Sequence, residues 1–183
     1  TKRLEEGFWA THAQNVSPST GFNVDYRSRG TRGMYIHQGT RDRNLSAAFS
    51  HTGKKYSVHA GYIFNMGDIK ENGGIVRDKD ITDTIFEMPE LIEVRLQDAR
   101  NVFKNNTFYV VQSYGIPLRR LTDEDFSIAQ NSSVFVGHAF QYSRFYKNYT
   151  DTKAQSGDYY EHWYISPTAT YDSIFESLLS NRV

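Results

Sequence analysis

The stretch Tyr56-Ser-Val-His-Ala-Gly-Tyr-Ile-Phe-Asn-Met66 decides the fold. Every even position carries an aromatic, aliphatic or methionine side chain, whereas the odd positions are mostly polar or small. Because successive side chains of a strand point to opposite faces, this alternation predicts a β-strand with one apolar and one polar face. The stretch matches the ~9–11 residues of a membrane-crossing strand and is about twice as long as the ~5–6 residues typical of globular proteins. It therefore predicts a strand that crosses a bilayer.

The same two-residue period recurs in weaker form along the chain. The predicted apolar faces consist of Phe22, Val24 and Tyr26; Leu45, Ala47 and Phe49; Ile92, Val94 and Leu96; Phe108, Val110, Tyr114 and Ile116; and Val134, Val136, Phe140 and Tyr142. Residues 8–14 and 160–166 are two further strand candidates without a clean face. Residues 172–181 are better interpreted as a short helix, capped at Asp172 or Ser173.

The predicted connections differ in length. His51-Thr-Gly-Lys-Lys55 is a glycine-containing turn between two strands, and residues 99–106 form another short connection. Residues 67–90 and 119–132 are long, polar and charged. Short connections that alternate with long ones are typical of outer-membrane barrels, which have tight periplasmic turns and longer external loops. We therefore predict an all-β fold, an antiparallel transmembrane β-barrel.

The composition excludes several other classes of protein. The chain has 183 residues, 21 basic and 21 acidic side chains, 15% aromatic residues and no cysteine. A neutral chain without a basic face gives no case for nucleic-acid binding, and the aromatic content argues against disorder. No stretch approaches the ~20 apolar residues of a membrane-spanning helix. The lack of cysteine excludes disulfides and thiolate metal sites, and it suits assembly in the periplasm.

The sequence contains no constellation of residues that indicates catalysis. The six histidines are isolated, without the spacing of a metal site. No Gly-x-Ser-x-Gly nucleophile motif occurs. Glu71-Asn-Gly-Gly-Ile75 is the most distinctive loop sequence, and it indicates a turn because glycine readily adopts positive φ. We expect no enzymatic activity, no metal and no cofactor.

The charged residues of the predicted strands suggest which side faces the lumen. On a lipid-facing side, an arginine or lysine would cost ~2–4 kcal/mol at the membrane midplane. In a membrane barrel these residues must therefore face the lumen, whereas in a soluble sheet they would simply face outward. The residues predicted to face the lumen are Asp25, Arg27, Ser57, His59, Asn65, Glu93 and Arg95.

The chain resembles the putative porins of Bacteroidota, a family of large outer-membrane barrels. The resemblance rests on Glu71-Asn-Gly-Gly-Ile75 after a long alternating strand, on Val94-Arg-Leu-Gln-Asp-Ala-Arg-Asn101, on Val136-Gly-His-Ala-Phe140 and on Asp172-Ser-Ile-Phe-Glu-Ser-Leu-Leu-Ser-Asn181. It implies that residues 1–183 belong to a single barrel domain in the cell outer membrane. It also implies a passive pore for small solutes, surrounded by outer-membrane lipid and without catalytic residues.

Members of that family are longer, and barrels usually end on a strand with a terminal aromatic residue. Val183 instead follows the predicted helix, and residues 1–14 contain no secretory signal. We therefore expect a fragment of a larger barrel. One alternative is a soluble or surface-anchored β-sandwich that binds glycans through Trp9, Tyr159, Tyr160 and Trp163. Another is a barrel subunit with a scaffold role beside other outer-membrane proteins.

Overall fold

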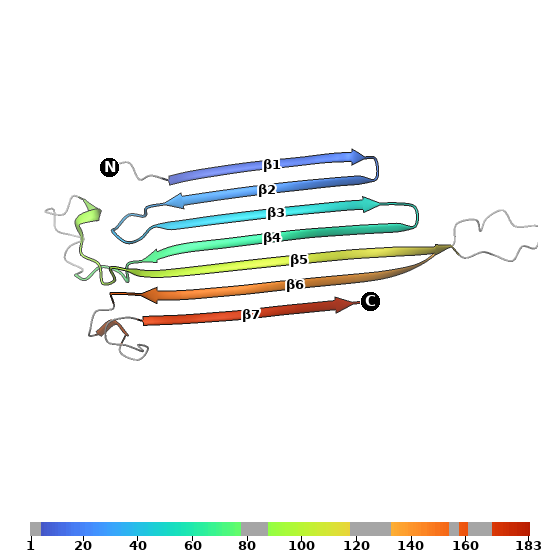
Figure 1. Ribbon diagram of the computed structural model, residues 1–183. Helices are drawn as coiled ribbons and strands as arrows, with labels where there is room; N and C mark the ends of the chain where they lie inside the picture. Colours follow the sequence, from blue (N-terminus) through green and yellow to red (C-terminus); the bar gives the residue numbers. More distant parts are fainter. Residues whose placement is uncertain (1–4, 78–87, 118–132, 154–157, 161–169) are drawn as a thin grey trace, which may run out of the picture.

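Seven strands lie side by side in chain order and form one antiparallel sheet (Figure 1). The computed structural model describes residues 5–77, 88–117, 133–153, 158–160 and 170–183. The strands are β1 (Glu5–Ser17), β2 (Thr20–Thr31), β3 (Thr40–Thr52), β4 (Tyr56–Glu71), β5 (Ala99–Pro117), β6 (Ser133–Asp151) and β7 (Thr170–Arg182). Two 3-10 helices, η1 (Pro89–Leu91) and η2 (Asp158–Tyr160), lie outside the sheet. Within these ranges, no helix has the length and apolar character needed to cross a membrane.

The predicted all-β antiparallel fold is confirmed, as is the long strand at β4. The sheet itself is open, with β1 and β7 as its two edges. Each described strand contacts only its neighbours in the sheet, so the strands form a single layer. The strands contain 12 to 19 residues, more than the ~5–6 typical of globular proteins.

Tight turns join strands at one end of the sheet, which we call the turn end. Residues 18–19 connect β1 to β2, and residues 53–55 connect β3 to β4. The predicted turn at 51–55 is thus confirmed, and it is closed by a hydrogen bond from the Gly53 N–H to the Tyr56 carbonyl at 2.8 Å. At the opposite end, the loop end, the connections are 32–39, 72–98 and 152–169.

The predicted alternation of short and long connections was wrong at one point. β5 ends and β6 begins at the turn end (Figure 1), although residues 118–132 separate them in the sequence. The error arose because residues 99–106 were predicted to be a short connection. They are instead the first part of β5. Residues 99–106 carry polar side chains on both faces, so they show no apolar alternation in the sequence. Their pairing with β4 and β6 stabilises them as a strand.

Two further elements differ from the prediction. Residues 92–96 are not a strand of the sheet, because only Val94 forms a bridge, to Ile75. Their alternating apolar side chains pack into the loop end, where Ile92 and Leu96 are buried. Residues 172–181 are not a helix but most of β7, since pairing with β6 overrides their weak local preference. Of the predicted strand 160–166, only Tyr160 is described, in η2; the other residues lie outside the described ranges.

Candidate functional site

The strand register divides the residues between two faces, because residues opposite each other on paired strands share a face. Tyr62 of β4 lies opposite Ala47 of β3 and Phe108 of β5. Its neighbour Gly61 lies opposite Ala48 on the other side of the sheet. We call the face that carries Tyr62 the apolar face and the face that carries Gly61 the polar face.

Aliphatic and aromatic side chains form a band across the apolar face from β1 to β6, interrupted on β5 and β6 by the hydrogen-bonded pair Gln112 and His138. The band includes Phe8, Ala10, Phe22, Val24, Tyr26, Leu45, Ala47, Phe49, Val58, Ala60, Tyr62, Phe64, Phe108, Val110, Phe140 and Tyr142. No described element packs on it. Phe8 remains 61% exposed, and Phe49 44%. Exposed apolar surface of this extent indicates contact with a membrane or with another protein.

The band has the height of the hydrocarbon layer that outer-membrane barrels cross. Along β4 it runs from Tyr56 to Met66. The ten steps between them, at ~3.3 Å each, span ~33 Å along the strand, or roughly 25 Å for a strand tilted by ~40°. Outer-membrane barrels carry an outward apolar band of about this height.

The band also slants across the sheet. In β1 its apolar side chains stop before His12, which lies level with Tyr62. In β5 and β6 they reach the pair Ile116 and Val134, beyond the level of Tyr56. Strands about 4.8 Å apart and inclined by ~40° need an offset of about one residue per strand to keep a band level with a membrane. The direction of the band across the sheet is therefore the one expected if the strands are tilted relative to a membrane.

The polar face carries five of the seven residues predicted to face the lumen. Asp25 and Arg27 of β2 share it with Ser57, His59 and Asn65 of β4. All five side chains lie on the other side of the sheet from the apolar band. The register thus brings together residues from two strands that are not direct neighbours.

Glu93 and Arg95 lie outside the seven strands, in the segment between η1 and β5. The prediction placed them on a strand, and that strand does not exist. Their backbones belong to the loop end, where the Glu93 carbonyl accepts a hydrogen bond from the Val76 N–H and the Arg95 N–H donates to the Gly74 carbonyl. No strand register assigns these two side chains to either face.

A polar cluster on β1 and β2 surrounds Asp25, and most of its members were not predicted from the sequence. The Asp25 carboxylate accepts hydrogen bonds from Trp9 Nε1 at 2.8 Å and Thr11 Oγ1 at 2.6 Å. It also pairs with Arg27 Nε at 3.0 Å, and the Arg27 guanidinium lies 5.0 Å from the centre of the Trp9 ring. The tight turn at Pro18 fixes the register of this hairpin, so recognising that turn would have predicted the cluster.

Glycines on the polar face make room for aromatic rings from the neighbouring strand. A Cβ atom on Gly61 would lie only 2.5 Å from the Tyr109 ring, which covers it from β5. The Phe103 ring covers Gly67 in the same way. An open hollow of ≈ 360 Å³ lies beside Tyr109, lined mostly by small and polar residues of this face such as Ala48 and His59. Small side chains thus keep part of the polar face accessible to water.

A small buried cluster closes over the polar face at the loop end. Gly73 and Gly74 have φ values of 66° and 89°, which confirms the turn predicted at this position. The turn is joined to the segment before β5 by a hydrogen bond from the Leu96 N–H to the Asn72 carbonyl at 2.9 Å. Leu96 then packs against Ala99 and the η2 residue Tyr160.

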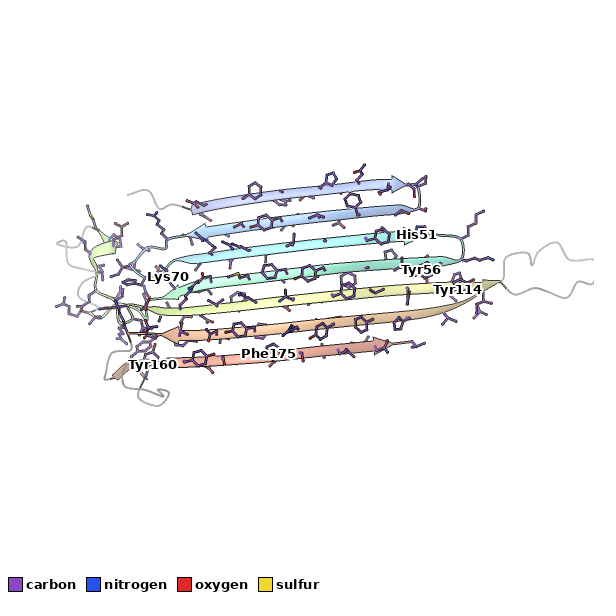
Figure 2. The ribbon with its side chains drawn as sticks, viewed as in Figure 1. His51, Tyr56, Lys70, Tyr114, Tyr160 and Phe175 are labelled. Atoms are coloured by element: carbon purple, nitrogen blue, oxygen red, sulfur yellow. The ribbon has the colours of Figure 1, made fainter. Side chains whose placement is uncertain are left out.

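Asp151, at the end of β6, is the polar centre of this cluster and is 1% exposed. Its carboxylate accepts hydrogen bonds from Tyr160 Oη at 2.9 Å and from the Lys153 N–H at 3.1 Å. The Tyr149 and Tyr160 hydroxyls lie 2.5 Å apart. Burial raises the pKa of Tyr160, so its hydroxyl stays protonated and donates to Asp151. Figure 2 shows Tyr160 at the loop end of the sheet.

The Tyr160→Phe variant should loosen this cluster without unfolding the sheet. The change removes one donor from the buried Asp151 carboxylate, which should cost about 1 kcal/mol of local stability. Hydrogen exchange of the Leu96 and Lys153 amides would measure the effect, and both should exchange about fivefold faster. Amides in the centre of β4 should keep their rates. Unchanged exchange at Leu96 and Lys153 would contradict the proposed packing.

The aromatic residues of the glycan-binding alternative do not gather in one place. Trp9 lies in edge strand β1, whereas Tyr159 and Tyr160 lie in η2, beyond β6. Tyr160 is buried. Trp163 lies outside the described residues. The described ranges also contain no group of three or more His, Asp or Glu side chains placed to hold a metal ion.

Comparison with known proteins gives one match. The family model described as "Putative porin" matches residues 2–183, nearly the whole chain. No curated protein and no solved structure matches the chain.

Proposed function

The chain belongs to the putative porin family, and from this premise we propose that its sheet forms part of the wall of a pore in the cell outer membrane. In this proposal the apolar face contacts lipid, and the polar face lines an aqueous path. The observation that carries the proposal is the division of six strands into an apolar band of membrane height and an opposite polar face. Small solutes cross passively, and no catalytic step is involved.

The backbone chemistry of a bilayer supports this arrangement. Lipid offers no hydrogen bonds, so every N–H and C=O group at membrane depth must pair within the protein. The five inner strands satisfy this requirement through both neighbours, whereas β1 and β7 each have one edge without a partner among the described strands. We propose that these edges are paired in a closed barrel, which is how membrane sheets remove their edges.

The polar face supports weak selectivity between ions. Asp25 and Arg27 place opposite charges side by side, and the other predicted lumen residues of β4 are uncharged polar groups or a histidine. A path lined in this way would discriminate between solutes by their size and by local charge, and only weakly between cations and anions. In this proposal the buried cluster around Asp151 lies at the loop-end mouth of the path.

Reconstitution of the full-length protein in a planar bilayer tests the proposal. We expect stepwise conductance, with similar permeabilities for K⁺ and Cl⁻. Absence of conductance from a correctly inserted protein would contradict the pore. If the inserted protein were silent alone and were found only in a stable complex, a scaffold role would replace the pore.

Partition between detergent and aqueous phases separates the proposal from the soluble alternative. A β-sandwich requires a second sheet packed on the first, and the described residues form only one sheet. We expect the full-length protein in the detergent phase. A water-soluble monomer would contradict the membrane location.

A further inference from the structure

The charged residues of the apolar face all lie on one side of the apolar band. Every charged side chain among the described strand residues of this face lies toward the loop end. They are the basic residues Arg41, Arg43, Lys70, Arg100, Lys104 and Arg144 and the acidic residues Glu6 and Asp68. Cations therefore clearly outnumber carboxylates along this border.

The opposite border of the band carries no such charge. Toward the turn end, the described strand residues of this face are uncharged or histidine, among them Thr20, His51, Tyr56 and Tyr114. Figure 2 shows His51, Tyr56 and Tyr114 near the turn end and Lys70 at the other end. The strand residues would thus give a basic border at the loop end and an aromatic, uncharged border at the turn end, where the exposed Lys54 and Lys55 lie beyond the strands in the β3–β4 turn.

The carboxylates do not neutralise the basic border. Arg100 binds Asp68 through two hydrogen bonds, from Nε at 2.7 Å and from Nη2 at 2.5 Å. Among the described residues of the apolar face, Arg100 and Asp68 form the one ion pair. Arg43 and Lys104 lie on either side of Met66 in one row. In the same row Arg43 also lies beside Ser28, and Lys104 beside Tyr146, so no carboxylate stands next to either cation in that row.

Arg144 continues the border on β6, one row closer to the band, as the slant requires. Its guanidinium lies 5.2 Å from the centre of the Phe175 ring. Arg43, Lys104 and Arg144 are all exposed. Long basic side chains can lay their apolar stems on such a band and extend their charged ends to the interface.

We propose that Arg43, Lys104 and Arg144 bind the phosphate groups of an anionic lipid in the leaflet at the loop end, with Arg41, Lys70 and Arg100 adding to the positive field. Guanidinium and ammonium groups are the side chains that proteins use for phosphate, and basic residues beside a membrane attract anionic headgroups. The position of these residues at the edge of an apolar band favours a lipid over a free anion. This inference rests on the proposed function, since it requires the apolar face to contact a membrane.

Lipid retention tests the site on the full-length protein. The probe is lipid A, whose headgroup is a diphosphorylated glucosamine disaccharide, mixed with phosphatidylcholine in detergent micelles. Native mass spectrometry would count the lipid A molecules that remain bound. The wild type should retain lipid A in preference to phosphatidylcholine. The variant R43Q/K104Q/R144Q should lose retention at least severalfold.

The matched control removes the same charge from the polar face. Arg29, Lys147 and Arg182 lie there, and R29Q/K147Q/R182Q should retain lipid A as the wild type does. Equal retention by all three proteins, or equal loss by both variants, would overturn the lipid site. Release of lipid A by millimolar inorganic phosphate would also overturn it, because the site would then recognise the free anion.

Failure of the lipid site and failure of the pore give different results. A protein that enters the detergent phase and conducts, but shows no preference for lipid A, contradicts only the lipid site. A protein that stays in the aqueous phase contradicts both. The folding of each variant is checked by comparing the electrophoretic mobility of unheated and heated samples. A misfolded variant is thereby recognised before its lipid retention is measured.

Discussion

Ala47→Arg is expected to destabilise the membrane-inserted protein by about 2–4 kcal/mol, because it places a charge in the middle of the apolar band. Ala47 lies opposite Val24 and Tyr62, so lipid would surround a longer side chain at this position. A urea titration of the protein refolded into lipid vesicles would measure the loss in the free energy of unfolding.

The neighbouring residue provides the control. Ala48 is the same amino acid in the same strand, but it lies on the polar face opposite Asn23 and Gly61. The Ala48→Arg variant should lose much less stability, because its guanidinium can extend into water. Equal losses for the two variants would mean that the faces do not differ in their surroundings.

Gly61→Val is the second substitution with a large expected effect. Its Cβ would lie 2.5 Å from the Tyr109 ring, so the ring must move away from β4. Overpacking of this kind typically costs about 1–3 kcal/mol. The same urea titration would measure the loss.

Two further variants separate the steric cause from a general intolerance of valine. Gly7 lies on the same face in β1, and a Cβ there would have no neighbour within 4 Å. Gly7→Val should therefore be neutral or slightly stabilising, since β-branched residues favour strands. Adding Tyr109→Ala to Gly61→Val should recover part of the loss. A double variant that is as unstable as the sum of its parts would contradict the packing of Tyr109 over Gly61.

The sequence predicted the centre of the sheet well because an exposed apolar face, which we propose to contact lipid, follows a simple rule there. On β4 the apolar band requires an apolar residue at every second position for about the thickness of a bilayer, and this long alternation is visible without a structure. The same rule identified Asp25, Arg27, Ser57, His59 and Asn65 as residues that share the other face. For these positions, alternation along one strand was sufficient evidence.

The prediction was wrong where alternation had another cause or was absent. Ile92, Val94 and Leu96 alternate because they pack into the loop end, so Glu93 and Arg95 were assigned to a strand that does not form. The first part of β5 shows no apolar alternation, because it extends past the band. β7 pairs with β6 although Ile174 and Phe175 lie on opposite faces. Pairing between strands, which depends on distant residues, decided these cases.

The side-chain clusters depend on register and could not be read from single strands. The contact of Trp9 and Thr11 with Asp25 follows from the pairing of β1 with β2. The basic border of the apolar face brings together residues of β3, β4, β5 and β6. Their residue types are visible in the sequence, but their common level relative to the band requires the alignment of all four strands.

Labelling of single cysteines along β4 tests the central claim most directly, because the chain has no cysteine of its own. Cysteine would be placed in turn at Ser57, His59 and Asn65 on the polar face and at Ala60, Tyr62 and Phe64 on the apolar face of the inserted full-length protein. We predict rapid reaction of the polar-face positions with a charged, water-soluble thiol reagent, and reaction of the apolar-face positions only with a lipid-soluble one. Equal reactivity at both sets of positions, or the reverse alternation, would contradict a sheet with lipid on one face and water on the other.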